Sequence, residues 1–225
     1  MPTQVINKIK VSLIDALQIL ISLIGGCTSR TAEYRFVYRN LTPPGTKILD
    51  IGCCDSLLAL KLAKRDYQVT GIDARPYLEK HSRLTFVQAD ACRMPFPDEN
   101  FDAVIAVSTI EHVGLGAYGD PVQEGADARV VKEIHRVLKP GGRLILTTPF
   151  AAKYRLASWR GGQERYYDAI TLQRLLGSFE IIKKEFFTGK SRFRWVSDTE
   201  EEAKNPALRW HANVAIILEK KRSLN

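Results

Sequence analysis

The sequence predicts an α/β, Rossmann-like fold: a seven-stranded, mostly parallel sheet with a reversed last strand and helices on both faces. Between residues 46 and 150, short runs rich in Ile, Val and Leu alternate with helical patterns. Strands that alternate with helices indicate right-handed crossovers and a parallel sheet. Near the C-terminus, FEIIKKEFF and HANVAIILEKK follow each other without a clear helix between them. Such runs predict an antiparallel pair at the sheet edge.

The individual elements follow in chain order. The stretch TSRTAEYRFVYRNL predicts an amphipathic helix that Thr28 or Ser29 caps, and TPPG at residues 42–45 then breaks the chain. Strand patterns recur in KILDI, QVTGI, LTFVQ, FDAVIAV and RLILTT. Helical patterns stand between some of them, in LLALKLAKR, PYLEKH and DARVVKEIHRVL.

The first residues predict a helical extension, residues 1–40, ahead of a main domain at residues 41–225. The apolar run VSLIDALQILISLIGG follows two lysines and precedes Cys27, a pattern that an export signal shares. Asp15 and Gln18 interrupt the run, which is too short and too polar for a membrane span. Its apolar positions fit one helical face, namely Ile6, Ile9, Leu13, Leu17 and Leu20. We therefore expect a packed or interfacial helix, with peripheral membrane contact through residues 5–24 as one consequence.

Composition limits the classes of function. The chain has 225 residues, of which 45% are hydrophobic, and this suits one compact domain. Its net charge is +8, but the charges are scattered, which favours a solvated basic surface over a specific polyanion site. Four cysteines occur without a CxxC pair or zinc-type spacing, so we expect free thiols, a cytoplasmic location and no metal.

Polar residues stand at the ends of three successive predicted strands. Asp50 and Gly52 end the first, Asp73 ends the second about twenty residues later, and Asp90 follows the third. In an open α/β sheet, ligands bind outside the carboxyl ends of the strands. A glycine there lets the backbone approach a ligand closely, and a carboxylate can accept hydrogen bonds from the hydroxyls of a ribose. A single strand-end Asp is often only a helix cap, but three in order favour a nucleotide site.

The sequence resembles the class I S-adenosylmethionine-dependent methyltransferases, in their small-molecule, type 11-like branch. The resemblance covers about residues 47–149 and rests on KILDIGCCDS, VTGIDARP, FVQADACRMPFPDENFDAVIAVSTIEHV and HRVLKPGGRLILTTP. It implies S-adenosyl-L-methionine as the cofactor. Asp50 and Gly52 would line the methionine moiety, and Asp73 would hold the ribose. The implied cofactor-binding set is Asp50, Gly52, Cys53, Asp73, Ala74, Asp90, Ala91, Val107 and Ser108.

Within this set, Asp90 and Ala91 would meet the adenine, while Val107 and Ser108 would close the floor under the sulfonium. The sequence departs from the family at Cys54 and Ser56, where glycine is common. A Cβ at residue 54 narrows the pocket or excludes a positive φ. Both side chains are small, so we interpret them as a tolerated variant; weakened cofactor binding is the alternative.

Two residues after the fourth predicted strand are candidates for catalysis. Methyl transfer needs alignment of the acceptor, exclusion of water and, for some acceptors, removal of a proton. Glu111 and His112 lie where the acceptor should sit, and histidine is the natural base near neutral pH. The alternative is that His112 only orients its loop.

Three segments outside the common core are expected to set specificity: residues 114–127, a glycine-rich candidate lid, and residues 149–168 and 192–210. The last two interleave arginines with aromatic rings. This composition suits a flat, anionic or carbohydrate acceptor, or alternatively a rim that covers the core.

The sequence therefore predicts an enzyme that transfers a methyl group from S-adenosylmethionine to oxygen or nitrogen of a small-molecule or glycan acceptor. One alternative is a methyltransferase-like protein without catalysis. A second is a nucleic-acid methyltransferase, but no RNA-binding module or base-flipping stretch is visible, so no stable nucleic-acid partner is expected. LKPGG and the paired last strands disfavour an NAD-dependent oxidoreductase.

Overall fold

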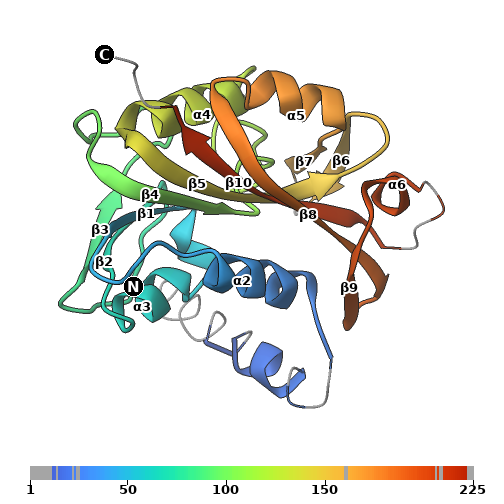
Figure 1. Ribbon diagram of the computed structural model, residues 1–225, viewed down its shortest axis with the longest axis horizontal. Coiled ribbons are helices and arrows are strands. Elements are labelled where there is room, and N and C mark those ends of the chain that lie inside the picture. The colour runs from blue at the N-terminus through green and yellow to red at the C-terminus, as the bar shows by residue number, and fades with distance from the viewer. Residues whose placement is uncertain are drawn as a thin grey trace.

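The computed structural model describes residues 12–13, 15–21, 23, 26–159, 162–205, 207 and 210–221. One twisted sheet runs through the molecule, with α4 (Ala126–Val137) and α5 (Ala169–Leu175) on one face and α2 (Ser29–Arg39) and α3 (Leu58–Ala63) on the other (Figure 1). Each face of the sheet therefore has its own apolar core, as the α/β prediction requires.

The sheet has eight strands in the order β3-β2-β1-β4-β5-β10-β8-β9. The strands β3, β2, β1, β4 and β5 run parallel to one another, and β10 is antiparallel to both of its neighbours, β5 and β8. The predicted mostly parallel sheet with a reversed last strand is confirmed, and β9 adds a strand beyond the predicted seven. Their bounds are β1 Lys47–Ile51, β2 Gln68–Asp73, β3 Leu84–Gln88, β4 Phe101–Val107, β5 Leu138–Phe150, β8 Phe179–Ser191, β9 Arg194–Asp198 and β10 Ala212–Lys220.

The last two predicted strands pair as expected, but the prediction that they form the sheet edge is wrong. The C-terminal strand β10 lies between β5 and β8, and the edge belongs to β9. The reason is burial: residues 212–218 of β10 are all buried, as a strand covered on both faces must be. The edge turn instead carries Lys190, Arg192 and Arg194, charges of the kind that protect an open edge.

The predicted side-chain cap of α2 is confirmed. The side chain of Thr28 accepts a hydrogen bond from the backbone N of Thr31, 3.1 Å away, at the start of α2. Asp168 and Thr171 form a capping box at the start of α5. Three shorter elements complete the chain: the 3₁₀ turn η1 (Cys53–Asp55), the hairpin β6 (Arg155–Trp159) with β7 (Gly162–Tyr166), and α6 (Glu200–Ala203).

The predicted helix at residues 76–81 is wrong, and so is the helical assignment of His81. Only residues 74–83 connect β2 to β3, and they contain no helix. This connection is too short for a helix with a turn at each end. Tyr77 fixes it instead, because its ring packs 5.8 Å from that of Phe86 and its hydroxyl donates to the carbonyl of Ser56.

The helix α2 belongs to the packed interior. Phe36 and Val37 are fully buried, and the ring of Phe36 lies 6.5 Å from that of Phe187 in β8. A division of the chain at residue 40 stays a prediction, but α2 shares a core with the sheet on one face.

The N-terminal apolar run is helical where the structure describes it, at residues 12–13, 15–21 and 23, which confirms a helix there. The other residues of 5–24, including Ile6 and Ile9, lie outside the described residues. An ion pair between Asp15 and Lys61 joins this helix to α3. Ile21 is buried, whereas Leu13, Leu17, Ile19, Leu20 and Leu23 are exposed. No helix among the described residues has the length and apolarity to cross a membrane.

Candidate functional site

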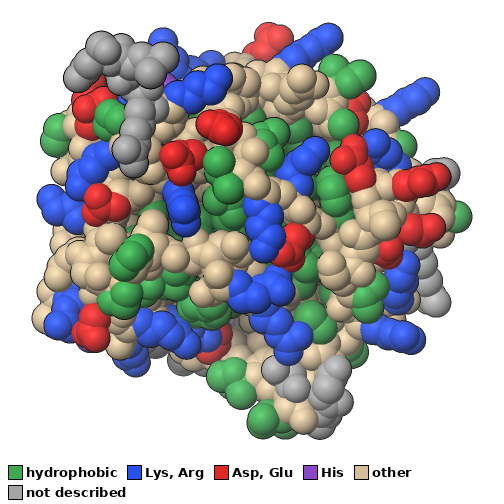
Figure 2. Space-filling view, viewed as in Figure 1, with side chains coloured by type: hydrophobic (Ala, Val, Ile, Leu, Met, Phe, Trp, Pro, Cys, Tyr) green, Lys and Arg blue, Asp and Glu red, His purple; other side chains and the backbone are tan. Residues whose placement is uncertain are grey.

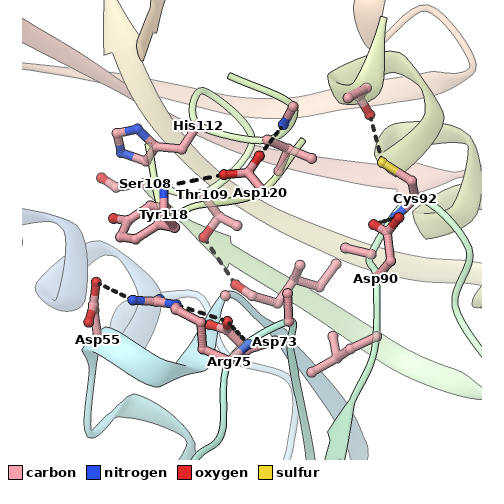
Figure 3. Close-up of a pocket in the computed structure, with 18 of the residues that line it drawn as sticks. Asp55, Asp73, Arg75, Asp90, Cys92, Ser108, Thr109, His112, Tyr118 and Asp120 are labelled. Carbon is pink, nitrogen blue, oxygen red and sulfur yellow. Dashed lines mark hydrogen bonds and ion pairs between the residues drawn. The ribbon is translucent and has the colours of Figure 1, made fainter. Parts of the chain in front are cut away.

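A cavity of about 430 Å³ opens at the carboxyl ends of β1, β2, β3 and β4, a volume typical of small-molecule sites. Figure 3 shows Asp73 and Asp55 on one side of it, Asp90 and Cys92 on another, and the loop after β4 opposite. Nine of the residues singled out from the sequence line this cavity: Asp50, Gly52, Asp73, Ala74, Asp90, Ala91, Val107, Ser108 and His112.

Two of the predicted residues are not among those that line it. Cys53 is fully buried, and a Cβ built on Gly71 would lie only 2.8 Å from its sulfur, so its side chain points into the core under β2. Glu111 is also buried, with 1% exposure, and does not line the cavity, although one of its oxygens lies 3.9 Å from Nε2 of His112. Neighbouring residues of an extended or turned segment point in different directions, so the roles of Cys53 and Glu111 stay predictions.

The turn after β1 depends on Gly52. Its φ is +76°, and a Cβ there would meet the side chain of Thr109 at 2.6 Å. The positive φ thus falls at Gly52 and not at Cys54. The side chain of Cys54 turns away, and its thiol donates to the carbonyl of Arg75 at 2.9 Å. Ser56 accepts from the backbone N of Leu58 at the start of α3, so both departures from the family pattern suit the local backbone.

Asp50 has a buried carboxyl group with an unsatisfied oxygen and a raised pKa. It is buried and lines the cavity, and its Oδ2 has no hydrogen-bond partner. Burial raises the pKa of its carboxyl to about 7, with Asp73 acting in the same direction and Arg30 against it. An unpaired buried carboxylate is costly, so this oxygen is suited to a cationic ligand group.

Asp73, at the end of β2, is held by its own neighbours. Its carboxylate accepts from the backbone N of Cys54 at 3.0 Å and from the backbone N of Arg75 at 2.9 Å. The guanidinium of Arg75 donates to the same two oxygens, each at 3.3 Å, and also to Asp55 at 3.2 Å. Figure 3 shows this chain of contacts along one wall of the cavity.

Asp90 lies beside Asp73 on the same rim. The backbone N of Ala89 donates to the carbonyl of Asp73 at 3.1 Å, which joins the ends of β3 and β2. Asp90 accepts from the backbone N of Cys92 at 2.8 Å, in a turn that directs the following residues along the cavity. The expected side-by-side arrangement of the two acids is therefore present.

The candidate lid after β4 forms the opposite wall. Asp120 accepts from the backbone N of Gly114 at 2.9 Å and from that of Tyr118 at 3.2 Å, which fixes the loop. The guanidinium of Arg75 lies 4.2 Å from the centre of the Tyr118 ring, a cation–π distance. This contact joins the end of β2 to the loop across the cavity.

The floor of the cavity is tied to α2. Glu33 is 1% exposed, and one of its oxygens accepts from Ser108 at 2.5 Å, Thr147 at 2.8 Å and Asn213 at 2.9 Å. Arg30, one helical turn earlier, donates to the carbonyl of Val107 at 3.2 Å and lines the cavity. The sequence analysis missed both residues. A signal existed, because positions 30 and 33 continue the helical face of Phe36 and Val37 with charged residues.

His112 lines the cavity beside the loop that follows β4. Its Nε2 lies 3.9 Å from an oxygen of Glu111 and 3.9 Å from an oxygen of Glu164 in β7, and its ring meets that of Tyr118 edge to face. Glu111 accepts from the hydroxyl of Thr148 at 3.2 Å. Burial raises the pKa of the Glu111 carboxyl well above its usual value, and Glu33 and Glu164 add to the rise. Among the described residues, no group of three His, Cys, Asp or Glu is placed to hold a metal ion.

The geometry can be compared with known proteins. Residues 49–146 match the family model described as a methyltransferase domain, of type 11. The chain is 40% identical over 111 residues to sterol 24-C-methyltransferase ERG6B of Gibberella zeae, covering 44% of this chain and 26% of that protein. It is 34% identical over 123 residues to a ubiquinone biosynthesis O-methyltransferase of Xanthomonas axonopodis pv. citri, covering 50% and 47%. The chain thus spans less than half of the length of these relatives.

Among solved structures, a SAM-dependent methyltransferase from Methanosarcina mazei superposes with a TM-score of 0.63 at 21% identity, over 84% of this chain and 99% of that one. The match over residues 49–146 is to a methyltransferase domain, and the fold is the one found in class I S-adenosylmethionine-dependent methyltransferases.

The cavity fits the cofactor of this class. The unpaired oxygen of Asp50 suits an ammonium group, Arg30 suits a carboxylate, and the backbone at Gly52 leaves room that a Cβ would remove. Asp73 fits a sugar diol, provided that the guanidinium of Arg75 releases its oxygens.

The role of Gly52 can be tested against Gly45, which has a similar φ of +87° but no atom within 4 Å of a built Cβ. We expect either Gly→Ala change to lower the free energy of unfolding by roughly 1 kcal/mol, the cost of a positive φ for alanine. Only Gly52→Ala should also weaken binding of S-adenosylhomocysteine, by tenfold or more, because the new methyl group displaces Thr109 from the cavity wall.

Urea unfolding and isothermal titration calorimetry measure the two effects. Equal S-adenosylhomocysteine affinities for Gly52→Ala and Gly45→Ala would contradict the assignment of this turn to the cofactor.

Proposed function

We propose that the protein transfers a methyl group from S-adenosyl-L-methionine to an oxygen or nitrogen of a small-molecule acceptor. The observation that carries this proposal is the buried, unpartnered oxygen of Asp50, which faces a cavity that Asp73 and Asp90 also line. A carboxylate in that position needs a cation, and the methionine moiety of the cofactor has one.

In this proposal, Asp50 binds the ammonium group of the cofactor and Arg30 its carboxylate. Asp73 accepts from the ribose hydroxyls after Arg75 turns away, with Ala74 beside it, and the pair Asp90 and Ala91 borders the adenine. Val107 and Ser108 lie under the sulfonium. When bound, the cofactor supplies an electrophilic methyl group on a positively charged sulfur.

At the acceptor end, His112 orients a hydroxyl or amine and accepts its proton. Glu111 has a supporting role, since its carboxyl is buried beside His112 and burial raises the pKa of that carboxyl well above its usual value. The fixed loop at residues 114–125 excludes water above the reacting atoms. These roles need no group beyond a positioned base, which matches the chemistry of a sulfonium leaving group.

The acceptor class rests on two arguments. The relatives named above act, by their names, on a sterol and in ubiquinone biosynthesis, and both point to a small amphiphilic or aromatic acceptor. The hairpin near His112 carries an arginine on an aromatic ring, with Arg155 lying 3.8 Å from the centre of Tyr166. The same pair suits a glycan, which is the second form of this proposal.

A direct experiment follows. The protein is incubated with S-adenosylmethionine labelled in its methyl group and with phenols, amines, sterols, quinone precursors, oligosaccharides and tRNA, and products are read by mass spectrometry. We expect label in a small-molecule or oligosaccharide product. His112→Gln should lower the rate by about 10²-fold or more, because a positioned base contributes 10²–10⁴, and should leave S-adenosylhomocysteine binding unchanged.

The alternatives give different outcomes. Cofactor binding without transfer to any acceptor would favour a methyltransferase-like protein without catalysis. Label in tRNA that declines steeply with salt would favour a nucleic-acid methyltransferase.

We also propose that the N-terminal helix contacts an anionic membrane surface from the cytoplasmic side. Leu13, Leu17, Leu20 and Leu23 are 49–78% exposed. Figure 2 shows hydrophobic side chains at the lower edge of the molecule, with Lys and Arg side chains above them. Apolar side chains beside basic ones are typical of interfacial helices. The free cysteines, such as Cys27, suit the reducing cytoplasm.

Sedimentation with vesicles of phosphatidylcholine and phosphatidylserine tests this contact. We expect Leu17→Glu with Leu20→Glu to abolish association, because each inserted leucine contributes about 1.5–3 kcal/mol of burial. Ile170→Glu, at an exposed position of α5 on the other face of the sheet, is the matched control and should bind as the wild type does. Undiminished sedimentation of the double variant would argue against a membrane role for this helix.

A further inference from the structure

The hairpin β6–β7 brings a second carboxylate to His112. Glu164 lies in β7, and one of its oxygens is 3.9 Å from Nε2 of His112. Its side chain is 12% exposed, so this charge pair is largely shielded from water. The two residues are far apart in sequence, and Glu164 stood out in no sequence motif.

Arg165 fixes the hairpin to the loop that carries His112. Its backbone N donates to the carbonyl of Glu111 at 2.9 Å. Its guanidinium donates to the carbonyl of Val113 at 2.8 Å and pairs with Asp127 at 3.3 Å. Because Arg165 is 4% exposed and directly follows Glu164, the distance between Glu164 and His112 is set by buried contacts and not by mobile side chains.

The hairpin also packs against the lid. A Cβ at Gly162 would lie 2.4 Å from the backbone N of Ala117, so the two backbones are in close contact. This contact holds β7 against the same loop from a second side. Glu164 is therefore positioned relative to both His112 and the lid.

The two carboxylates that flank His112 differ in their surroundings. Glu111 is almost fully buried, and burial raises its carboxyl pKa well above the usual value, which disfavours its charged form. Burial also raises the pKa of Glu164, but a hydrogen bond from Tyr166 and the charge of Arg155 oppose this effect. Glu164 is therefore the better candidate for the charged partner of the imidazole.

Two further groups lie near this imidazole. Tyr118 meets the ring edge to face at a centroid distance of 5.5 Å. Arg30 of α2 is a nearby cation that interacts electrostatically with both Glu111 and Tyr118.

We propose that Glu164 is a positioning residue for His112: it orients the imidazole and balances the charge that the ring gains when it takes a proton from the acceptor. The inference rests on the proposed methyl transfer. In that step the acceptor loses its proton to His112 and forms a bond to the methyl carbon. The bond from that carbon to the sulfonium sulfur breaks with its electron pair, which leaves a neutral sulfur and an imidazolium beside Glu164.

The test requires neither cofactor nor acceptor. The chain has four histidines, so ¹³C resonances of labelled imidazoles can be assigned with single substitutions and followed from acid to alkaline pH. In Glu164→Gln we expect the titration midpoint of His112 to fall by about one pH unit, the effect of losing an opposite charge at this distance. His81 and His135 should titrate as in the wild type and so report an intact fold.

Two matched variants complete the design. Glu111→Gln, at the same distance from the ring, should move the His112 midpoint less, because burial disfavours the charged form of that carboxyl. Glu164→Asp keeps the charge and should recover at least half of the shift. The inference is overturned if Glu164→Gln leaves the His112 midpoint unchanged, or if Glu111→Gln has the larger effect. Failure of methyl transfer in the labelling experiment would leave these titrations as they are, so the two proposals fail separately.

Discussion

The site depends on one constraint: carboxylates gathered at the carboxyl ends of parallel strands must each find a partner in a medium that solvates charge poorly. Glu33 satisfies this constraint with three hydrogen bonds that join α2 to β5, β10 and the residue after β4 beneath the cavity. Asp73 does so with two backbone N–H groups and Arg75. Asp50 differs, because one of its oxygens is buried beside the cavity without a partner. Among the described strand-end carboxyl groups, that of Asp50 is thus the one with a buried oxygen left for a ligand to satisfy.

This arrangement gives the cavity two chemically different ends. Asp50, Asp73 and Asp90 define an end that suits an aminoacyl nucleoside, and the fold and domain family agree with it. The other end is formed by the loop after β4 and by the hairpin β6–β7, which meet at His112. In the proposed assignment, the cofactor end is built from the common sheet, whereas the acceptor end is built from segments added to it. Such a division lets the acceptor change while the cofactor site is retained.

Much of the cofactor end could be predicted from the sequence, because each strand-end acid follows its own strand directly and parallel strands align their carboxyl ends. Side-chain direction could not be predicted, and Cys53 and Glu111 are buried residues that do not line the cavity. Contacts between distant segments were also out of reach: Glu164 reaches His112 through packing of the hairpin that no local pattern encodes. The internal position of β10 could not be predicted either. Its apolar run indicates burial on both faces, but it does not indicate which strands lie beside it.

The most direct test of the account is the pH dependence of S-adenosylhomocysteine binding, measured by isothermal titration calorimetry. Because the carboxyl of Asp50 has a pKa of about 7 in the free protein, it is largely protonated near pH 6 and ionised near pH 8. An ammonium group binds the ionised form, so the affinity should be about tenfold weaker at pH 6 than at pH 8, and Asp50→Asn should remove this difference. Equal affinities of the wild-type protein at the two pH values would contradict the assignment of Asp50 to the cofactor and, with it, the proposed function.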